Sequence, residues 1–117
     1  MKIMTYNVME GGVRPDNSRL EKVLQVIDGQ NADVFGLQET KVAQGKDNEL
    51  IWALKEAGKY QHHEVFENSG EWTYKSGVSL SSKMQPSSSR IIGEGVRAVE
   101  ITFPSIIGNI NISNVYC

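Results

Sequence analysis

The chain contains few of the features that mark secreted or membrane proteins. Its one cysteine, Cys117, excludes an intramolecular disulfide and is weakly typical of a reducing compartment. No apolar run approaches the roughly 20 residues that span a bilayer. The N-terminus enters an apolar, strand-like segment directly and lacks the long apolar region of a secretory signal. These features predict a soluble, cytoplasmic protein without a transmembrane segment.

Neither positive nor negative charge is in large excess. Twelve lysines and arginines oppose fourteen acidic residues, for a net charge of −2. This balance excludes a strongly basic surface, so binding to nucleic acid would depend on local geometry or on metal ions. A length of 117 residues with 39% hydrophobic residues predicts one small globular domain.

Two apolar, strand-like segments, residues 3–8 and 32–40, enclose one helix-length stretch. Ser18 and Glu21 have the spacing of a capping box, which predicts a helix that begins there. Gly29 is expected to end this helix. The helix has one apolar stripe at positions i, i+3, i+4 and i+7, formed by Leu20, Val23, Leu24 and Ile27. The pattern is typical of a βαβ unit, whose two strands are parallel.

Both of these strands end in polar side chains. Asn7 ends the first, and Gln38 and Glu39 end the second. Parallel strands finish at the same edge of a sheet, where open α/β sheets bind their ligands. The sequence therefore predicts that Asn7 and Glu39 lie side by side in a candidate site.

The remainder predicts a second helix and four shorter strands. Residues 49–57 form a helix that Gly58 ends, with Leu50, Ile51 and Leu54 facing inward. The expected strands are residues 63–66, 77–83, 96–103 and 106–116, and the turn-rich segments that connect them include residues 85–89 and 108–109. The fold class is α/β, with a mixed sheet and about two helices on one face. Because the last strand runs to the final residue, we expect a chain that is cut at a strand end.

Three segments resemble the endonuclease/exonuclease/phosphatase superfamily of metal-dependent phosphoesterases, which includes DNase I-like nucleases. They are KIMTYNV (residues 2–8), ADVFGLQE (32–39) and GVSLSSK (77–83). The resemblance implies a four-layer α/β sandwich, of which residues 1–117 form a single partial domain, the N-terminal half. The family's Asp-x-Asn and Ser-Asp-His motifs are not in the sequence, so we expect this chain alone to have little or no activity.

The resemblance assigns roles to individual residues. It implies that Glu39 is a metal ligand and that Asn7 is a catalytic and metal-site residue, with Mg²⁺ or Mn²⁺ as the cofactor. Gln38 is expected to be a supporting polar contact. The segment SNVY (residues 113–116) lies where the family carries either a histidine or a tyrosine version of a motif. We favour the tyrosine version, which makes Tyr116 a catalytic candidate; the alternative is a packing residue.

The same chemistry follows from the needs of the reaction. Phosphodiester cleavage requires neutralisation of phosphate charge and activation of a water, and a divalent ion supplies both. Mg²⁺ is usually bound by one or two carboxylates together with water and substrate phosphate. A single glutamate at a strand end fits this role. The neutral Asn7 can orient a water or bond a phosphate oxygen without adding negative charge.

Other polar and aromatic residues have simpler interpretations. His62 and His63 are adjacent in a strand and point to opposite faces, so we expect one surface and one half-buried histidine and no metal site. Trp72 and Tyr74 are expected to pack against loops, although stacking on a base is the alternative. We expect Arg97 to be an exposed strand residue, with a phosphate contact as the alternative.

Two hypotheses of function follow. The first is a metal-dependent phosphoesterase that acts on a phosphate ester, with nucleic acid among the candidate substrates. The second is a non-catalytic binding or oligomerising module built on the same half-fold. Half of a two-sheet sandwich is expected to expose an apolar sheet face, which predicts self-association of the free chain.

Overall fold

A computed structural model describes residues 1–8, 18–40, 49–66, 77–92 and 97–116. At the ends of elements, the side chains of Ser18, Glu49, Arg97 and Tyr116 lie outside this description. Predictions for Trp72 and Tyr74 also lie outside the described residues, as does the side-chain prediction for Arg97.

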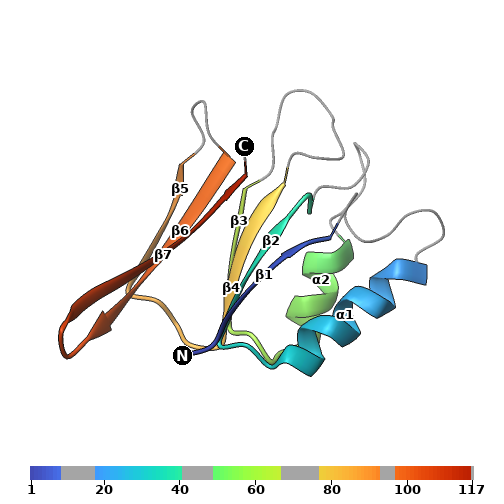
Figure 1. Ribbon diagram of the computed structural model, residues 1–117, viewed down its shortest axis with the longest axis horizontal. Coiled ribbons are helices and arrows are strands. Elements are labelled where there is room, and N and C mark those ends of the chain that lie inside the picture. Colours follow the sequence, from blue (N-terminus) through green and yellow to red (C-terminus); the bar gives the residue numbers. More distant parts are fainter. Residues whose placement is uncertain (9–17, 41–48, 67–76, 93–96, 117) are drawn as a thin grey trace.

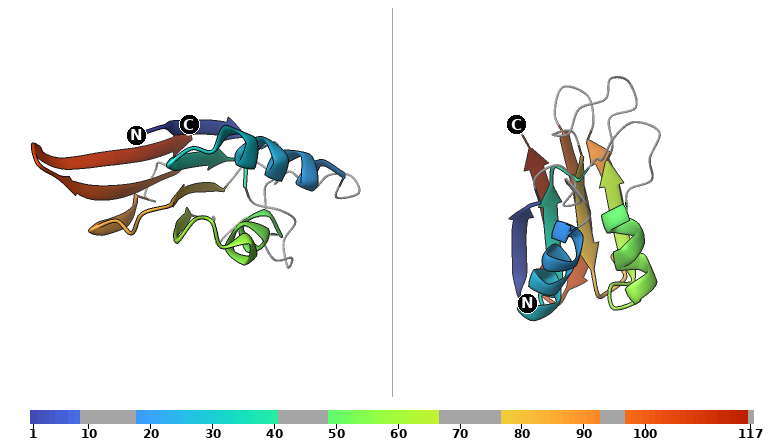
Figure 2. Two further views of the ribbon diagram at one scale, coloured as in Figure 1. Left: turned by 90° about the horizontal axis from the view of Figure 1, so that it is seen from below. Right: turned by 90° about the vertical axis from the view of Figure 1, so that its right-hand side faces the viewer.

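The described chain folds into three layers, shown in Figure 1. Two helices pack on a four-stranded sheet of order β1-β2-β4-β3, and a three-stranded sheet of order β5-β6-β7 covers part of its other face. Figure 2 shows the two helices in front of the strands when the molecule is viewed from the helix side. The elements are β1 (Ile3–Asn7), α1 (Ser18–Gln30), β2 (Val34–Gln38), α2 (Glu49–Ala57), β3 (His62–Phe66), β4 (Val78–Ser82), β5 (Ser88–Ile92), β6 (Arg97–Ser105) and β7 (Gly108–Tyr116).

The βαβ unit at the N-terminus is confirmed. β1 and β2 are parallel neighbours, and α1 connects them. Their register pairs Ile3 with Val34 and Asn7 with Gln38, so the two strands end level with one another. The four-stranded sheet is mixed, because β4 is antiparallel to both β2 and β3. The expected fold class, α/β with two helices on one face, is therefore confirmed.

The helix ends show one wrong prediction and one correct one. Gly29 does not end α1, which continues to Gln30. Asn31 ends it instead. Its backbone is left-handed, with φ 48°, and its backbone amide donates to the carbonyls of Ile27 and Asp28. Asparagine tolerates this conformation and can replace glycine after a helix. Gly58, with φ 71°, ends α2 as expected.

The strand β5 was not predicted. Residues 85–89 were interpreted as a connector, but Ser88 and Ser89 pair with Thr102 and Ile101 of β6. β5 lies at the edge of its sheet, and most of its side chains are exposed. Because an exposed edge strand buries few side chains, it does not need alternating apolar residues. Its serines therefore have the composition that is typical of a turn.

The apolar side chains form two cores, one on each face of the four-stranded sheet. The core under the helices contains Val8, Val23, Ile27, Phe35, Leu37, Leu50, Ile51, Leu54 and Tyr60. The core between the sheets contains Val34, Val78, Leu80, Val99, Ile101 and Phe103. Thus alternate residues of β2 are buried against different layers, as expected for a strand covered on both sides.

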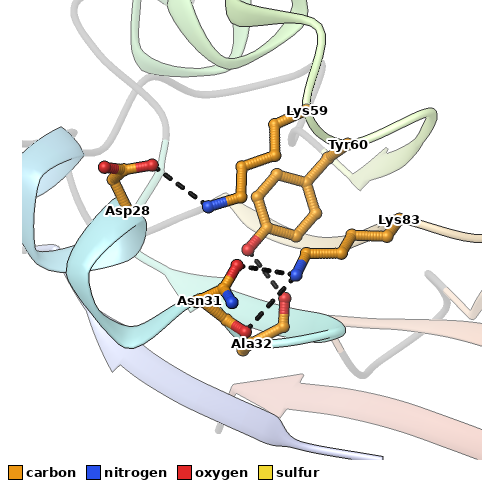
Figure 3. A network of polar contacts seen from close by, with 6 residues as sticks. All are labelled: Asp28, Asn31, Ala32, Lys59, Tyr60 and Lys83. Atoms are coloured by element: carbon orange, nitrogen blue, oxygen red, sulfur yellow. Dashed lines mark hydrogen bonds and ion pairs between the residues drawn. The ribbon is translucent and has the colours of Figure 1, made fainter.

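A polar network closes the end of the sheet where β2 begins, as Figure 3 shows. The Tyr60 hydroxyl donates to the Ala32 carbonyl at 2.7 Å, and its ring meets Phe35 edge-to-face, with ring centroids 4.6 Å apart. Lys83 donates to the Asn31 side chain at 2.7 Å, and Lys59 pairs with Asp28 at 3.1 Å. The opposite end of the sheet, where β1 and β2 finish, holds the predicted site.

The expectation of an uncovered apolar sheet face applies to a small part of the structure. The inner faces of the two sheets largely cover each other, and the outer face of β5-β6-β7 carries a polar row in which Arg90 and Ser113 both bond to Glu100. The exposed apolar side chains on the inner faces are Ile3 of β1 at 55%, Ile91 of β5 at 48% and Ile110 of β7 at 38% exposed. Self-association stays a prediction. Among the described residues, no helix is long and apolar enough to cross a membrane.

Candidate functional site

The carboxyl ends of β1 and β2 bring the predicted polar residues together. Asn7 and Gln38 are register partners in the last rung of the parallel ladder. The Val8 amide donates to the Gln38 carbonyl at 3.1 Å, which continues the pairing past the end of the strand. Glu39 follows Gln38 directly. The topology therefore places Asn7 and Glu39 at one sheet edge, as the sequence predicts.

Glu39 has an unusual backbone and an unusual degree of burial. Its φ of 58° lies in the left-handed region, which for most residues other than glycine costs about 1–2 kcal/mol. Only 8% of the residue is exposed, although glutamate is rarely buried. After it, the Thr40 amide donates to the Gly77 carbonyl at 3.2 Å and anchors the chain to the segment that leads into β4. Strained, non-glycine backbones are concentrated at functional sites.

A side chain from the second sheet reaches this edge. Asn114 of β7 is 7% exposed, and its Nδ2 donates to the carbonyls of Leu37 and Ser79, each at 2.8 Å. Its Oδ1 accepts from the Nε2 of Gln38 at 2.7 Å. The same Nε2 donates to Thr5 Oγ1 at 2.9 Å. These bonds connect β7, β4, β2 and β1 beside the predicted site.

An arginine from the first helix also approaches the end of β1. Arg19, in the first turn of α1, donates from Nη2 to the Val8 carbonyl at 3.4 Å. Its guanidinium therefore lies next to the strand end that carries Asn7. This bond places a cationic side chain beside the end of β1.

The two histidines of β3 have different partners. His63 Nε2 must donate to the Tyr60 carbonyl at 3.1 Å, so Nδ1 accepts from Ser81 Oγ at 2.7 Å. Burial is the main cause that lowers the pKa of His63. His62 Nε2 lies 3.6 Å from a carboxylate oxygen of Glu64. Both histidines are half-buried, so the prediction that one of them lies on the surface is wrong.

The donor set at the strand ends fits part of a magnesium or manganese site. Among the described residues, no group of three or more histidine, cysteine or acidic side chains is placed to hold a metal. One buried carboxylate and one amide, Glu39 and Asn7, suit a hard cation that keeps several waters. They do not suit a site such as that of zinc, which takes three or four protein ligands.

The model of the Endonuclease/Exonuclease/phosphatase family matches residues 4–107. This chain belongs to that family. The match includes Asn7, Gln38 and Glu39 and extends from β1 to the turn before β7.

A search of solved structures gives the fold independently. The chain is similar to a single-residue variant of the 3′ phosphatase NExo from Neisseria bound to a product DNA hairpin, with a TM-score of 0.66 and 24% identity. All of this chain is covered, but only 41% of that chain, so the family member described here spans less than half the length of its structural neighbour. A search of curated proteins gives no match.

Two contributors to the site were not predicted from the sequence. Asn114 lies in the expected strand 106–116, on the same face as Ile110 and Ile112, and no role was predicted for it. A polar residue at a core-facing position is a signal that could have identified it. Arg19 lies in the predicted helix that begins at Ser18, and nothing local in the sequence predicts its bond to Val8. The backbone of Tyr116 pairs with Arg97 in the sheet, and its proposed catalytic role stays a prediction.

Proposed function

We propose that this endonuclease/exonuclease/phosphatase family chain carries one wall of a metal-dependent phosphoesterase site, at the carboxyl ends of β1 and β2. The observation that carries the proposal is the state of Glu39: a buried acidic residue in a left-handed conformation at the end of a strand. A solvated strand end would need neither the burial nor the strain. The register that places Asn7 beside Gln38 supports a shared site.

In this proposal Glu39 is the anionic ligand of Mg²⁺ or Mn²⁺. When bound, the ion would polarise a phosphoryl oxygen and lower the pKa of a bound water. Asn7 then orients water or donates to a phosphate oxygen, and it adds no negative charge that would repel the substrate. Gln38 supports both residues from within the strand. Tyr116 is proposed as a further catalytic residue from β7.

The proposed substrate is a phosphate ester, with nucleic acid as the favoured class. The structural neighbour was solved with a DNA hairpin, and this supports a nucleic-acid ester over a lipid head group. The net charge of −2 means that attraction to a polyanion would be local. Arg19 supplies a positive group at the strand end. We also propose a cytoplasmic location, as the single cysteine suggests.

We further propose that residues 1–117 are a single partial domain with weak or no activity alone. The chain covers only 41% of the length of its structural neighbour. The described residues provide one carboxylate at the proposed site. A two-metal or water-activating arrangement needs more acidic or basic groups than these.

Binding of Mn²⁺ to the purified chain tests the metal role, with free Mn²⁺ measured by electron paramagnetic resonance. We expect binding by the wild type, weakening of at least tenfold in Glu39→Gln, and no change in Glu100→Gln. Glu100 is the matched control, because its side chain is half-buried but bonds to Arg90 and Ser113 on the outer face of the other sheet. Equal binding by Glu39→Gln and wild type would contradict the metal role.

The second candidate function, a non-catalytic oligomerising module, is favoured by the exposed strand edges. Within the described ranges β1 and β7 each pair on one side only. Neither strand contains a charged residue, and β7 is nine residues long. Long, uncharged edges are templates for pairing with another chain. A second copy of this chain is the proposed partner.

A further inference from the structure

The buried amide of Asn114 has one possible orientation. The carbonyls of Leu37 and Ser79 accept hydrogen bonds and cannot donate, so Nδ2 of Asn114 must face them. Its Oδ1 is then left for Gln38, which must offer its own nitrogen. Gln38 Nε2 uses its second hydrogen on Thr5 Oγ1. Each amide therefore fixes the orientation of the next.

The backbone of β2 is shaped to admit this side chain. A Cβ atom at Gly36 would lie 3.0 Å from both Cγ and Nδ2 of Asn114. Such a contact is tighter than almost all real Cβ contacts, and a side chain at position 36 would have to push the amide away by a few tenths of an ångström. Gly36 therefore permits the close approach of the amide. The surrounding inter-sheet core is apolar, with Val34, Val78 and Leu80 on the same face of the four-stranded sheet.

A polar group in such a core has an energetic cost, because it loses its hydration. Here all the hydrogen-bonding groups of the Asn114 amide that face the first sheet have partners, and a fully satisfied network makes its surroundings rigid. From Asn114 the network runs through Gln38, which pairs with Asn7 and precedes Glu39, to Thr5 of β1. The network therefore restrains the ends of β1 and β2 that carry the proposed metal site. It does not restrain the opposite end of the sheet.

We infer that Asn114 is a positioning residue, which acts through Gln38 to hold Glu39 and Asn7 in the geometry that binds the metal. This inference rests on the proposed metal role of Glu39. It assigns to the second sheet a part in the site, although Asn114 itself touches neither metal nor substrate. Residues that orient metal ligands typically change metal affinity about ten- to a hundredfold when they are removed.

The test compares Asn114→Ala with Ile112→Ala, a control from the same strand that packs against the same inter-sheet core. Both variants lose inter-sheet packing, but only the first loses the bond to Gln38. At a temperature at which both are folded by circular dichroism, we expect Asn114→Ala to bind Mn²⁺ at least tenfold more weakly than Ile112→Ala. Equal affinities would overturn the positioning role.

Gln38→Leu keeps the test decisive if Asn114→Ala fails to fold. This variant leaves both carbonyl bonds of Asn114 in place and removes only the connection to the strand ends. We expect the same loss of Mn²⁺ affinity, together with a lower thermal stability, because the buried Oδ1 of Asn114 loses its donor. Wild-type affinity in Gln38→Leu would overturn the inference.

Hydrogen exchange separates failure of this inference from failure of the proposed function. The Thr40 amide, bonded to the Gly77 carbonyl directly after Glu39, reports on the order of the strand end without any metal. We expect it to exchange at least tenfold faster in Asn114→Ala than in Ile112→Ala. If wild type fails to bind Mn²⁺ but this difference is present, the metal role of Glu39 is wrong and the positioning by Asn114 stands. If the difference is absent, the positioning is wrong.

Discussion

Gly36 of β2 and Asn114 of β7 are in direct contact across the space between the two sheets, where a Cβ on the glycine would meet the asparagine amide at 3.0 Å. The missing Cβ of Gly36 allows the Asn114 amide to approach the backbone of β2 closely. It also permits the two bonds from Asn114 Nδ2 to backbone carbonyls. A glycine inside a strand normally weakens it, so its presence here has a specific reason.

Gly36→Ala tests this contact. The added methyl must displace the Asn114 amide, and overpacking of this kind costs about 1–3 kcal/mol. We expect a fall of about 2 kcal/mol in the free energy of unfolding, measured by urea denaturation. Gly29→Ala is the matched control, because no atom lies within 4 Å of its Cβ position and it sits inside α1. The control should be stabilised by about 0.5 kcal/mol. Equal effects of the two substitutions would contradict the contact.

Two serines on the helix-facing side of β4 make a second matched pair. Ser79 Oγ is buried and has no hydrogen-bond partner within the described part of the chain, whereas Ser81 Oγ bonds to His63 Nδ1. An unsatisfied buried hydroxyl costs about 1 kcal/mol or more. We therefore expect Ser79→Ala to raise the free energy of unfolding by about 1 kcal/mol and Ser81→Ala to lower it by a similar amount. Thermal unfolding measures both, and a destabilised Ser79→Ala would show that the hydroxyl has a partner.

His63 predicts a dependence of stability on pH. Burial lowers its pKa below the ordinary 6.5, the positive charges of Lys55 and His62 lower it further, and the bond to the Tyr60 carbonyl opposes them. The unfolded chain therefore binds a proton near pH 6.5 that the folded chain does not yet bind. We expect the free energy of unfolding to fall as the pH decreases from about 6.5 toward the lower pKa of the folded state. His63→Gln should lose this part of the slope, and an unchanged slope would contradict the assignment.

The uncharged edge of β7 predicts self-association that a single charge should reduce. Val115 is 49% exposed on this edge strand, and a lysine there would disfavour pairing with a second chain. We expect sedimentation velocity to show a concentration-dependent dimer for wild type and a shift toward monomer for Val115→Lys. Trp52→Lys is the control, because Trp52 is 63% exposed on α2, away from the edge. A wild type that stays monomeric at high concentration would argue against the oligomerising module.

The sequence was sufficient for the parts of the fold that depend on strong local patterns. The capping box, the apolar stripe of α1 and the two apolar strands around it predicted the βαβ unit, and this unit places Asn7 beside Gln38. The error at Gly29 arose because two residues near the helix end can adopt a left-handed backbone, and Asn31 is the one that does. β5 was missed because an exposed edge strand carries no apolar alternation.

The rest of the site depends on contacts between residues far apart in the chain. Asn114 bonds to Gln38 and Leu37 across 76 and 77 positions, and no local pattern encodes such a pairing. The left-handed backbone of Glu39 is equally invisible in the sequence, because glutamate rarely adopts it and only the surrounding structure imposes it. The proposed metal roles of Asn7 and Glu39 came from the family resemblance, and the reason for the geometry of these two residues came from the fold.

The central claim is that Glu39 and Asn7 form the metal-binding wall, and paramagnetic broadening of amide signals by Mn²⁺ tests it most directly. In a two-dimensional nitrogen–proton spectrum of the purified chain, we expect substoichiometric Mn²⁺ to broaden first the backbone signals of Glu39 and Thr40 and the side-chain amide of Asn7. The same addition to Glu39→Gln should leave these signals sharp. Broadening centred on His62 and Glu64, or broadening that is unchanged in Glu39→Gln, would contradict the account.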